Sequence, residues 1–283
     1  MMNTKQKMIS LLLSMVLLLT GCQAKTATNE EVSGGTEEVT LADESAASNQ
    51  EQVSQEAEAD WEEDSTAQEL TDTIRWFNAS YAILTELNGW DYNRFAGLPV
   101  NEQTRQMQIE ALEEWWGVTD RTTADETLDW ILTEGHRSGF GEDMAYLEDI
   151  GIGQTADRKG FLMELGLTAE EADMYLGWYE MYEQYGDKAI AGWDYCRALN
   201  LMSFYYLAGY YSEEEALDKS LEIAQMVQPL FESWDDLIAS YMRGYEYWAE
   251  ESSAERQAIY EDIKSREDNP YRIDFKTDLQ KTW

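Results

Sequence analysis

The chain has 283 residues and carries 57 acidic residues against 20 basic ones, so its formal net charge is −37. This excess of negative charge argues against binding to nucleic acid or to anionic lipid through a basic face. Cationic partners, metal ions and neutral ligands remain open, and the charge also suits a protein that acidity simply keeps soluble. Hydrophobic residues make up 43% of the chain and aromatic residues 12%, which is enough for a substantial core.

The first residues have the features of a lipoprotein signal peptide. Lys5 and Lys7 give a positive region, and the apolar run 8–19 is too short to span a membrane. The following Leu-Thr-Gly-Cys22 resembles the bacterial lipobox, which implies cleavage after residue 21 and diacylglycerol on the Cys22 thiol. We therefore expect residues 1–21 to be removed and acyl chains on Cys22 to anchor the protein to the extracytoplasmic face of the cell membrane. An ordinary secretory signal followed by a chance cysteine is the alternative.

Residues 22–66 are expected to form a disordered acidic linker. The stretch 23–68 contains 13 acidic residues and one lysine, with almost no large apolar side chains. Such a segment cannot bury enough apolar surface to become ordered, and its like charges extend it. We interpret it as a spacer between membrane and domain, and a bait for basic partners is the alternative.

From residue 67 to residue 283 the sequence predicts one all-α domain of about nine or ten helices. Only 3 prolines occur, and the composition favours Ala, Leu, Met, Glu and Gln over β-branched residues. Apolar residues recur at intervals of three to four, with glycines at the expected helix ends. The first five expected helices span 69–87, 101–116, 120–133, 140–150 and 155–165.

Capping signals mark the later helices. Thr168 and Ser212 each begin a capping box, with Glu three residues further on. Pro229 predicts a kink or break, and Ser233 is the expected cap of the next helix. The last helix is expected at 252–265. Beyond it Tyr271, Ile273 and Phe275 alternate along the chain, which favours a short extended segment against the domain.

The stretch 190–211 is the expected centre of the domain. It contains no charge from Ala198 onward, and a helix that is apolar on nearly all sides is normally buried. Cys196 within it is interpreted as a small core residue rather than a nucleophile.

An aromatic stripe on the helix opened by Thr168 is the first candidate binding surface. Aromatic residues recur there at helical spacing between acidic residues: Tyr175, Trp178, Tyr179, Tyr182 and Tyr185. The first four, together with Trp193, are candidates for holding a sugar or a cationic ligand. The competing interpretation is that such a stripe is simply core.

His136 is the only histidine in the chain, and it follows the helix end predicted at Gly135. Near a helix C-terminus its charged form would be stabilised, and it would serve as a general base if a carboxylate oriented it. The structural alternative is a cap or a hydrogen bond between helices.

Asp194 and Arg197 are the charged residues of the central helix and lie three apart on one face. A buried Arg197 is suited to clamping a carboxylate or phosphate. Alternatively it forms a salt bridge with Asp194 or a distant acid, because a buried charge needs a partner. Trp193 and Arg197 are four apart and are expected to stack.

The sequence predicts no metal site and no cofactor. One histidine and one remaining thiol exclude the usual zinc arrangements, and no calcium loop is present. Phosphate-loop, dinucleotide and hydrolase motifs are likewise missing from the sequence.

Two blocks of short motifs stand far apart in the sequence. The first block consists of Trp116-Gly117-Val118, Asp120-Arg121, Leu128, Trp130, Gly135-His136-Arg137 and Phe140. The second consists of Trp193-Asp194-Tyr195-Cys196-Arg197, Gly209-Tyr210, Glu215-Ala216, Phe231, Ser233-Trp234, Tyr241, Gly244 and Trp248. Together, in their order and spacing, these motifs resemble the bacterial family known as domain of unknown function 1266. The resemblance covers roughly residues 75–283 and implies a single helical domain that contains both blocks, but no activity, substrate or catalytic residue.

These observations favour a membrane-anchored lipoprotein that binds a protein partner or a small ligand at the cell surface. An enzyme that brings His136, Arg137, Asp194 and Arg197 into one cleft is the alternative, and it requires the two blocks to meet in space. A third hypothesis is neutralisation of a basic toxin by the acidic surface. Without a recognisable catalytic motif, we favour a binding protein over an enzyme.

Overall fold

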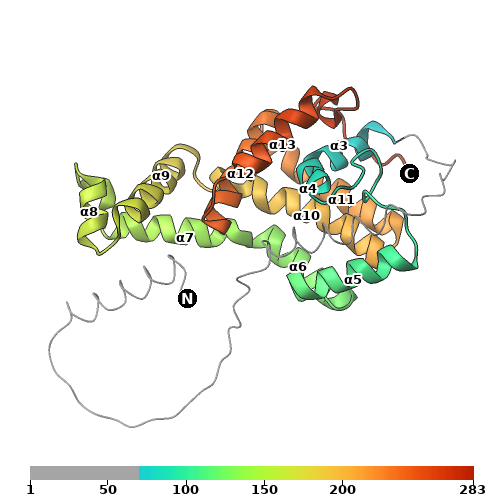
Figure 1. The fold of residues 1–283 in the computed structure, drawn as a ribbon, viewed down its shortest axis with the longest axis horizontal. Coiled ribbons are helices and arrows are strands. Elements are labelled where there is room, and N and C mark those ends of the chain that lie inside the picture. Colours follow the sequence, from blue (N-terminus) through green and yellow to red (C-terminus); the bar gives the residue numbers. More distant parts are fainter. Residues whose placement is uncertain (1–69) are drawn as a thin grey trace, which may run out of the picture. The chain divides into compact units, whose positions relative to one another are not determined.

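The computed structural model describes residues 70–283, and every regular element within them is a helix (Figure 1). The predicted all-α class is confirmed. None of the helices in this part of the chain combines the length and apolar character needed to cross a membrane. The predicted signal peptide, the lipidation site Cys22 and the acidic linker lie outside the described residues.

The described residues form two compact units. The smaller unit is Gly141–Gly186. It contains most of α7 (Gly135–Asp149), a 3₁₀ turn (Ile152–Gln154), α8 (Arg158–Glu164) and α9 (Ala169–Tyr185). The larger unit joins residues 70–140 to Asp187–Trp283. Its helices are α3 (Asp72–Ser80), α4 (Ala82–Leu87), α5 (Glu102–Trp116), α6 (Arg121–Thr133), α10 (Lys188–Ala208), α11 (Glu213–Val227), α12 (Trp234–Ala249) and α13 (Ala254–Ser265).

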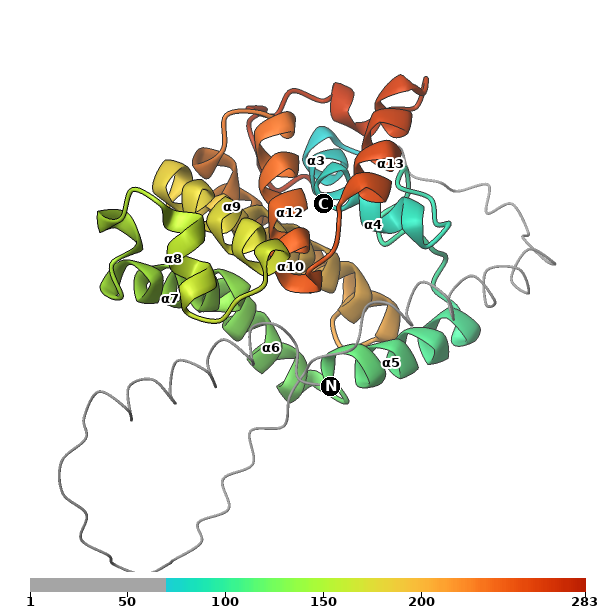
Figure 2. The same cartoon turned by 60° about the vertical axis from the view of Figure 1, so that its left-hand side comes forward.

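The central helix of the larger unit is α10, as the uncharged sequence predicts. Of its 21 residues, 17 are buried. It packs against α5, α6, α11 and above all α12, which lies beside it in both views (Figures 1 and 2). Because neighbouring helices surround α10, apolar residues occupy nearly all of its sides instead of one face.

Two glycines let α10 and α12 approach closely. A Cβ on Gly192 would lie 2.5 Å from the carbonyl oxygen of Leu237, and one on Gly244 would lie 2.2 Å from Cβ of Trp193. The Ser240 hydroxyl fills the remaining space, accepting from the Gly192 N–H at 2.9 Å and donating to the Lys188 carbonyl at 2.8 Å. Neither glycine can gain a methyl group unless the helices move apart.

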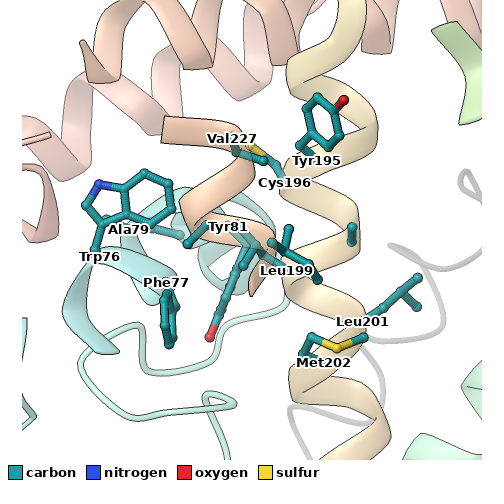
Figure 3. Close-up of a cluster of buried hydrophobic side chains, with 14 of the residues drawn as sticks. Trp76, Phe77, Ala79, Tyr81, Tyr195, Cys196, Leu199, Leu201, Met202 and Val227 are labelled. Atoms are coloured by element: carbon teal, nitrogen blue, oxygen red, sulfur yellow. The ribbon is translucent and has the colours of Figure 1, made fainter. Parts of the chain in front are cut away.

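The core of the larger unit lies between α10, α3 and α11. Figure 3 shows Cys196 of α10 beside Val227 of α11 and Leu199 beside Tyr81, with Trp76 of α3 in the same cluster of buried side chains. The Cys196 side chain is buried, and burial raises the pKa of its thiol far above the ordinary value. A thiol held neutral in this way is a core residue and not a nucleophile.

Helix ends that depend on local capping are where the sequence predicts them. Thr168 and Ser212 form the two predicted capping boxes, and Gly117 ends α5 in the left-handed conformation. Pro229 lies in the 3₁₀ turn Gln228–Leu230 between α11 and α12.

Three expected elements differ from the structure. The helix expected at 69–87 is divided into α3 and α4 at Tyr81, where the Ser80 hydroxyl donates to the Phe77 carbonyl and competes with the helix. The helix expected from residue 140 begins at Gly135, because Asp194 of α10 caps its first turn. The alternating segment after residue 270 is a 3₁₀ turn (Pro270–Arg272) followed by irregular chain, since side chains rather than a strand bind its backbone.

Candidate functional site

The corner between α6 and α7 is built around the buried carboxylate of Asp194. Gly135 turns the chain there with a φ of +61°, and α7 starts immediately. The N–H groups of His136 and Arg137 each donate to Asp194 at 3.0 Å. The first N–H groups of a helix have no partner within the helix, and they favour a negative charge. Asp194 on α10 therefore caps α7 from 58 residues away in the sequence.

The side chains of the same two residues complete the contacts of Asp194. Nδ1 of His136 lies 3.0 Å from Oδ1 of Asp194, and Nη1 of Arg137 lies 3.0 Å from Oδ2. Arg137 also donates to the carbonyls of Ile131, at 2.7 Å, and Leu132 in the last turn of α6. The ion pair of Arg137 and Asp194 thus provides hydrogen-bond partners for the last carbonyls of α6 and for the first N–H groups of α7.

The environment of Asp194 keeps it ionised. Burial raises the pKa of this carboxyl, but the hydrogen bond and positive charge of His136, together with both backbone N–H groups, lower it. The net result is a pKa below the ordinary value. This is the pattern expected of a buried carboxylate that accepts several hydrogen bonds.

Only glycine fits at the corner. A Cβ on Gly135 would lie 2.3 Å from Oδ2 of Asp194 and 2.6 Å from Nη1 of Arg137. The positive φ adds strain for any L-residue. Gly135, Arg137 and Asp194 are therefore interdependent.

Arg197, one turn along α10 from Asp194, lies among aromatic rings. Its guanidinium carbon is 4.2 Å from the ring centroid of Trp116, 4.7 Å from that of Trp193 and 5.6 Å from that of Trp248. The predicted stacking of Trp193 on Arg197 is confirmed. These distances are those of cation–π contacts.

His136 contacts the same group of rings. Its imidazole meets the edge of Trp130 at 5.2 Å between centroids and that of Trp248 at 6.4 Å. Trp248 thus touches both His136 and Arg197, so the two blocks of motifs do meet in space. We call Trp116, Trp130, Trp193 and Trp248 the indole cluster.

The indole cluster reaches the protein surface. Trp130 is 38% exposed, which makes it one of the few large hydrophobic side chains that are open to solvent. Trp116 and Trp248 are half-buried, Trp193 is fully buried, and the His136 side chain is 20% exposed. A surface of indole rings with an arginine and a histidine is suited to holding a flat group that carries hydrogen-bond acceptors.

The aromatic stripe on α9 is mostly interior. Tyr175, Trp178 and Tyr179 are buried, and Tyr182 is half-buried. Tyr175 and Trp178 pack edge to face with centroids 5.0 Å apart, and the Tyr179 hydroxyl donates to Glu148 at 3.4 Å. Four of the five predicted ligand-binding rings, these three and Trp193, are therefore covered by protein.

The environment expected for His136 needs correction. It lies in the first turn of α7 and not at the end of α6, so the nearby dipole of α7 disfavours its charged form and Asp194 favours it. The motif blocks contain Trp116, Trp130 and Trp248, but none of the three was predicted as a site residue. Trp130 had a usable signal, because it falls outside the buried face of α6 formed by Ala124, Leu128 and Ile131.

No group of three or more His, Cys, Asp and Glu side chains within residues 70–283 is arranged to hold a metal ion.

Comparison with known proteins identifies one relationship. A family model described as a protein of unknown function (DUF1266) matches residues 111–275, a stretch that contains every residue of the corner and of the indole cluster. No curated protein matches the chain, and no solved structure does. Since the match covers more than half of the 283 residues, the protein belongs to the DUF1266 family.

Proposed function

We propose that the protein is an exported, membrane-anchored lipoprotein whose helical domain binds a small ligand or a segment of a protein partner at the cell surface. The observation that carries the binding role is the partly exposed indole cluster around Arg197 and His136. Large aromatic side chains left open to solvent beside an arginine are typical of recognition sites.

The chemistry of the cluster defines the proposed ligand. Indole faces stack on flat groups, and the guanidinium of Arg197, which lies over the rings of Trp116 and Trp193, belongs to a group that recognises acceptors through its N–H donors. Carboxylate and phosphate are the acceptors that arginine binds best. The ligand would therefore combine a flat ring with a carboxylate or phosphate.

Benzoate and phenyl phosphate are suitable probes, with benzamide as the uncharged control. Because His136 is the only histidine, its imidazole proton NMR signals report on this site alone. We expect both anions, but not benzamide, to shift these signals and quench tryptophan fluorescence. Arg197→Met and Trp130→Ala should each weaken binding by about tenfold or more, a loss of about 1.4 kcal/mol.

Trp90→Ala is the matched control, since Trp90 is a half-buried tryptophan outside the cluster that packs on Phe204 at 5.9 Å. Its variant should bind the probes like the wild type. If no anion moves the His136 signals, or if Trp90→Ala weakens binding as much as Trp130→Ala, the proposed site is wrong.

The lipid anchor has a separate test. Cells producing the full chain would be labelled with an alkyne analogue of palmitate, and membranes would be separated from soluble material. Cys22→Ala should abolish the label and release the protein from the membrane fraction. The chain offers its own control, because Cys22 and Cys196 are its two cysteines and Cys196→Ala should retain the label.

One observation favours an enzyme as the second candidate function: Asp194 orients the ring of His136 at 3.0 Å. A carboxylate in this position fixes the imidazole tautomer and supports general-base catalysis. His136→Gln discriminates between the two, because a general base would be lost while probe binding through Arg197 and Trp130 is retained. Loss of probe binding in this variant would instead make His136 part of the binding surface.

A further inference from the structure

The C-terminal segment 273–283 has no regular secondary structure, yet side chains of the helices bind its backbone carbonyls at every second residue. Nε1 of Trp234 donates to the Ile273 carbonyl at 2.8 Å, and Nε1 of Trp76 donates to the Phe275 carbonyl at 2.9 Å. The side-chain amides of Gln228 and Gln225 continue the series. Gln228 reaches the carbonyls of Phe275 and Thr277 at 2.8 Å each, and Gln225 reaches that of Leu279 at 2.9 Å.

Side chains of the segment alternate in the same register. Phe275 and Leu279 are buried, whereas residues 274, 276, 278 and 280 are exposed. The Phe275 ring packs against Trp234 and Trp76, with centroids 5.0 and 5.6 Å apart. Apart from one turn, in which the Thr277 N–H donates to the Asp274 carbonyl, the segment thus has one face against the helices and one in solvent.

Charged and aromatic contacts fix the end of the segment. Nζ of Lys281 lies 2.9 Å from Glu214 and 2.8 Å from Asp218 on α11. Nε1 of Trp283 donates to Asp218 at 2.9 Å, and the Gln280 N–H donates to the hydroxyl of Thr73 at 3.2 Å. Figures 1 and 2 accordingly mark the C-terminus beside α3.

Fixed donors for alternate carbonyls, with pockets for the intervening apolar side chains, are how proteins bind extended peptides. We propose that Trp76, Gln225, Gln228 and Trp234 form a peptide-binding groove, which residues 271–283 of this chain occupy as a separable ligand. The peptide class it takes has two bulky apolar residues four apart, followed two residues later by a lysine. The groove shares no residue with the indole cluster and does not depend on the function proposed for that cluster.

Hydrogen exchange of the intact full chain tests whether the segment is separable. The amide of Gln280 donates to Thr73 of α3, so its exchange reports on undocking, whereas that of Thr277 reports on the turn within the segment. We expect the Gln280 amide to exchange through local opening, about a hundredfold faster than buried amides of α10 such as that of Leu199 and with little dependence on dilute urea. Exchange of Gln280 only at the rate of global unfolding would make the segment an integral part of the core and overturn the proposal.

Binding in trans is the second test. A protease site inserted after the exposed Glu267 allows the segment to be cut from the folded full chain. A fluorescent peptide of residues 271–283 should then bind the cut protein with saturable anisotropy. In the uncut protein the tethered segment competes with the peptide at an effective concentration on the order of millimolar. If the peptide binds the cut protein with a Kd of about 10 μM, it should therefore bind the uncut protein about a hundredfold more weakly.

Peptide variants check the register. Phe275→Ala in the peptide should weaken binding by about tenfold or more, since it removes a buried ring. Asp278→Ala is the control, because this side chain is exposed and accepts a hydrogen bond from Gln280 within the segment. Equal binding by cut and uncut protein, or equal weakening by both peptide variants, would show that no such groove exists.

Discussion

Asp194 and Arg197 lie within one turn of the same helix, and their surroundings differ sharply. Asp194 is fully buried and receives hydrogen bonds from two backbone N–H groups and an arginine, with a histidine nitrogen at the same distance. Arg197 is only half-buried, and three indole rings surround its guanidinium. The first residue organises the corner between α6 and α7, whereas the second belongs to a surface. Two charges that look like a pair in sequence thus have separate roles, and each role predicts a different response to mutation.

The largest effect should follow from Asp194→Asn. The variant removes the charge that Arg137 needs and places an amide N–H₂ next to N–H donors. Breaking a buried ion pair from one side typically costs about 3–5 kcal/mol. We expect a loss of this size in urea unfolding. Asp129→Asn makes the same chemical change at an exposed position of α6 and should alter stability by less than about 0.5 kcal/mol. Similar losses in both variants would contradict the role of Asp194 as a clamp.

Gly135→Ala should have the next largest effect. The added methyl group would lie 2.3 Å from Oδ2 of Asp194, and the alanine backbone would have to adopt a left-handed conformation. Gly117→Ala separates the two causes, because Gly117 has a similar φ of +64° with no atom within 4 Å of the added carbon. We expect Gly117→Ala to cost about 1 kcal/mol from strain alone. Gly135→Ala should cost at least about 2 kcal/mol, because overpacking adds to that strain. Equal losses of stability in the two variants would mean that the Asp194 side chain moves away from the added methyl group at no cost in free energy.

Acid should weaken the corner with a definite sign. The pKa of Asp194 is lower in the folded protein than its ordinary value of 3.8. Its contribution to stability is therefore complete above that value and is lost as the pH falls through the lower folded pKa. Urea midpoints measured between about pH 7 and pH 2.5 should fall more steeply at the acidic end for the wild type than for Asp194→Asn. Parallel curves would show that the carboxylate does not titrate with folding.

The corner also shows how far sequence reasoning reaches. Caps such as Thr168 and Ser212 were predictable, because their partners lie three residues away and capping depends only on local geometry. The central position of α10 was predictable from its lack of charge. The cap that Asp194 provides for α7 was not, because its partners are 58 and 57 residues distant and no local pattern reports such a contact.

For the candidate site the outcome is mixed for the same reason. His136, Arg137 and Asp194 were nominated as chemically unusual residues, and the fold does bring them together. The rings that surround Arg197 come from α5, α10 and α12, so only the neighbour four residues away, Trp193, was foreseen. The solvent exposure of Trp130 was predictable from its position on α6. Its proximity to His136 was not, because it depends on how the chain turns at the corner between α6 and α7.

The smallest effects on stability are expected for Trp130 and Arg197, which belong to the surface. Trp130 is 38% exposed, so replacing it with alanine should remove less buried area than the loss of a core tryptophan and cost about 1–2 kcal/mol in urea unfolding. Arg197→Met preserves most of the packing against Trp116 and loses mainly the cation–π contacts, each worth about 0.5–1 kcal/mol when partly exposed. Both variants should therefore lose less stability than Asp194→Asn. A loss of 3 kcal/mol or more in Trp130→Ala, a size typical of buried tryptophans, would make the indole cluster part of the core and remove its claim to be a recognition surface.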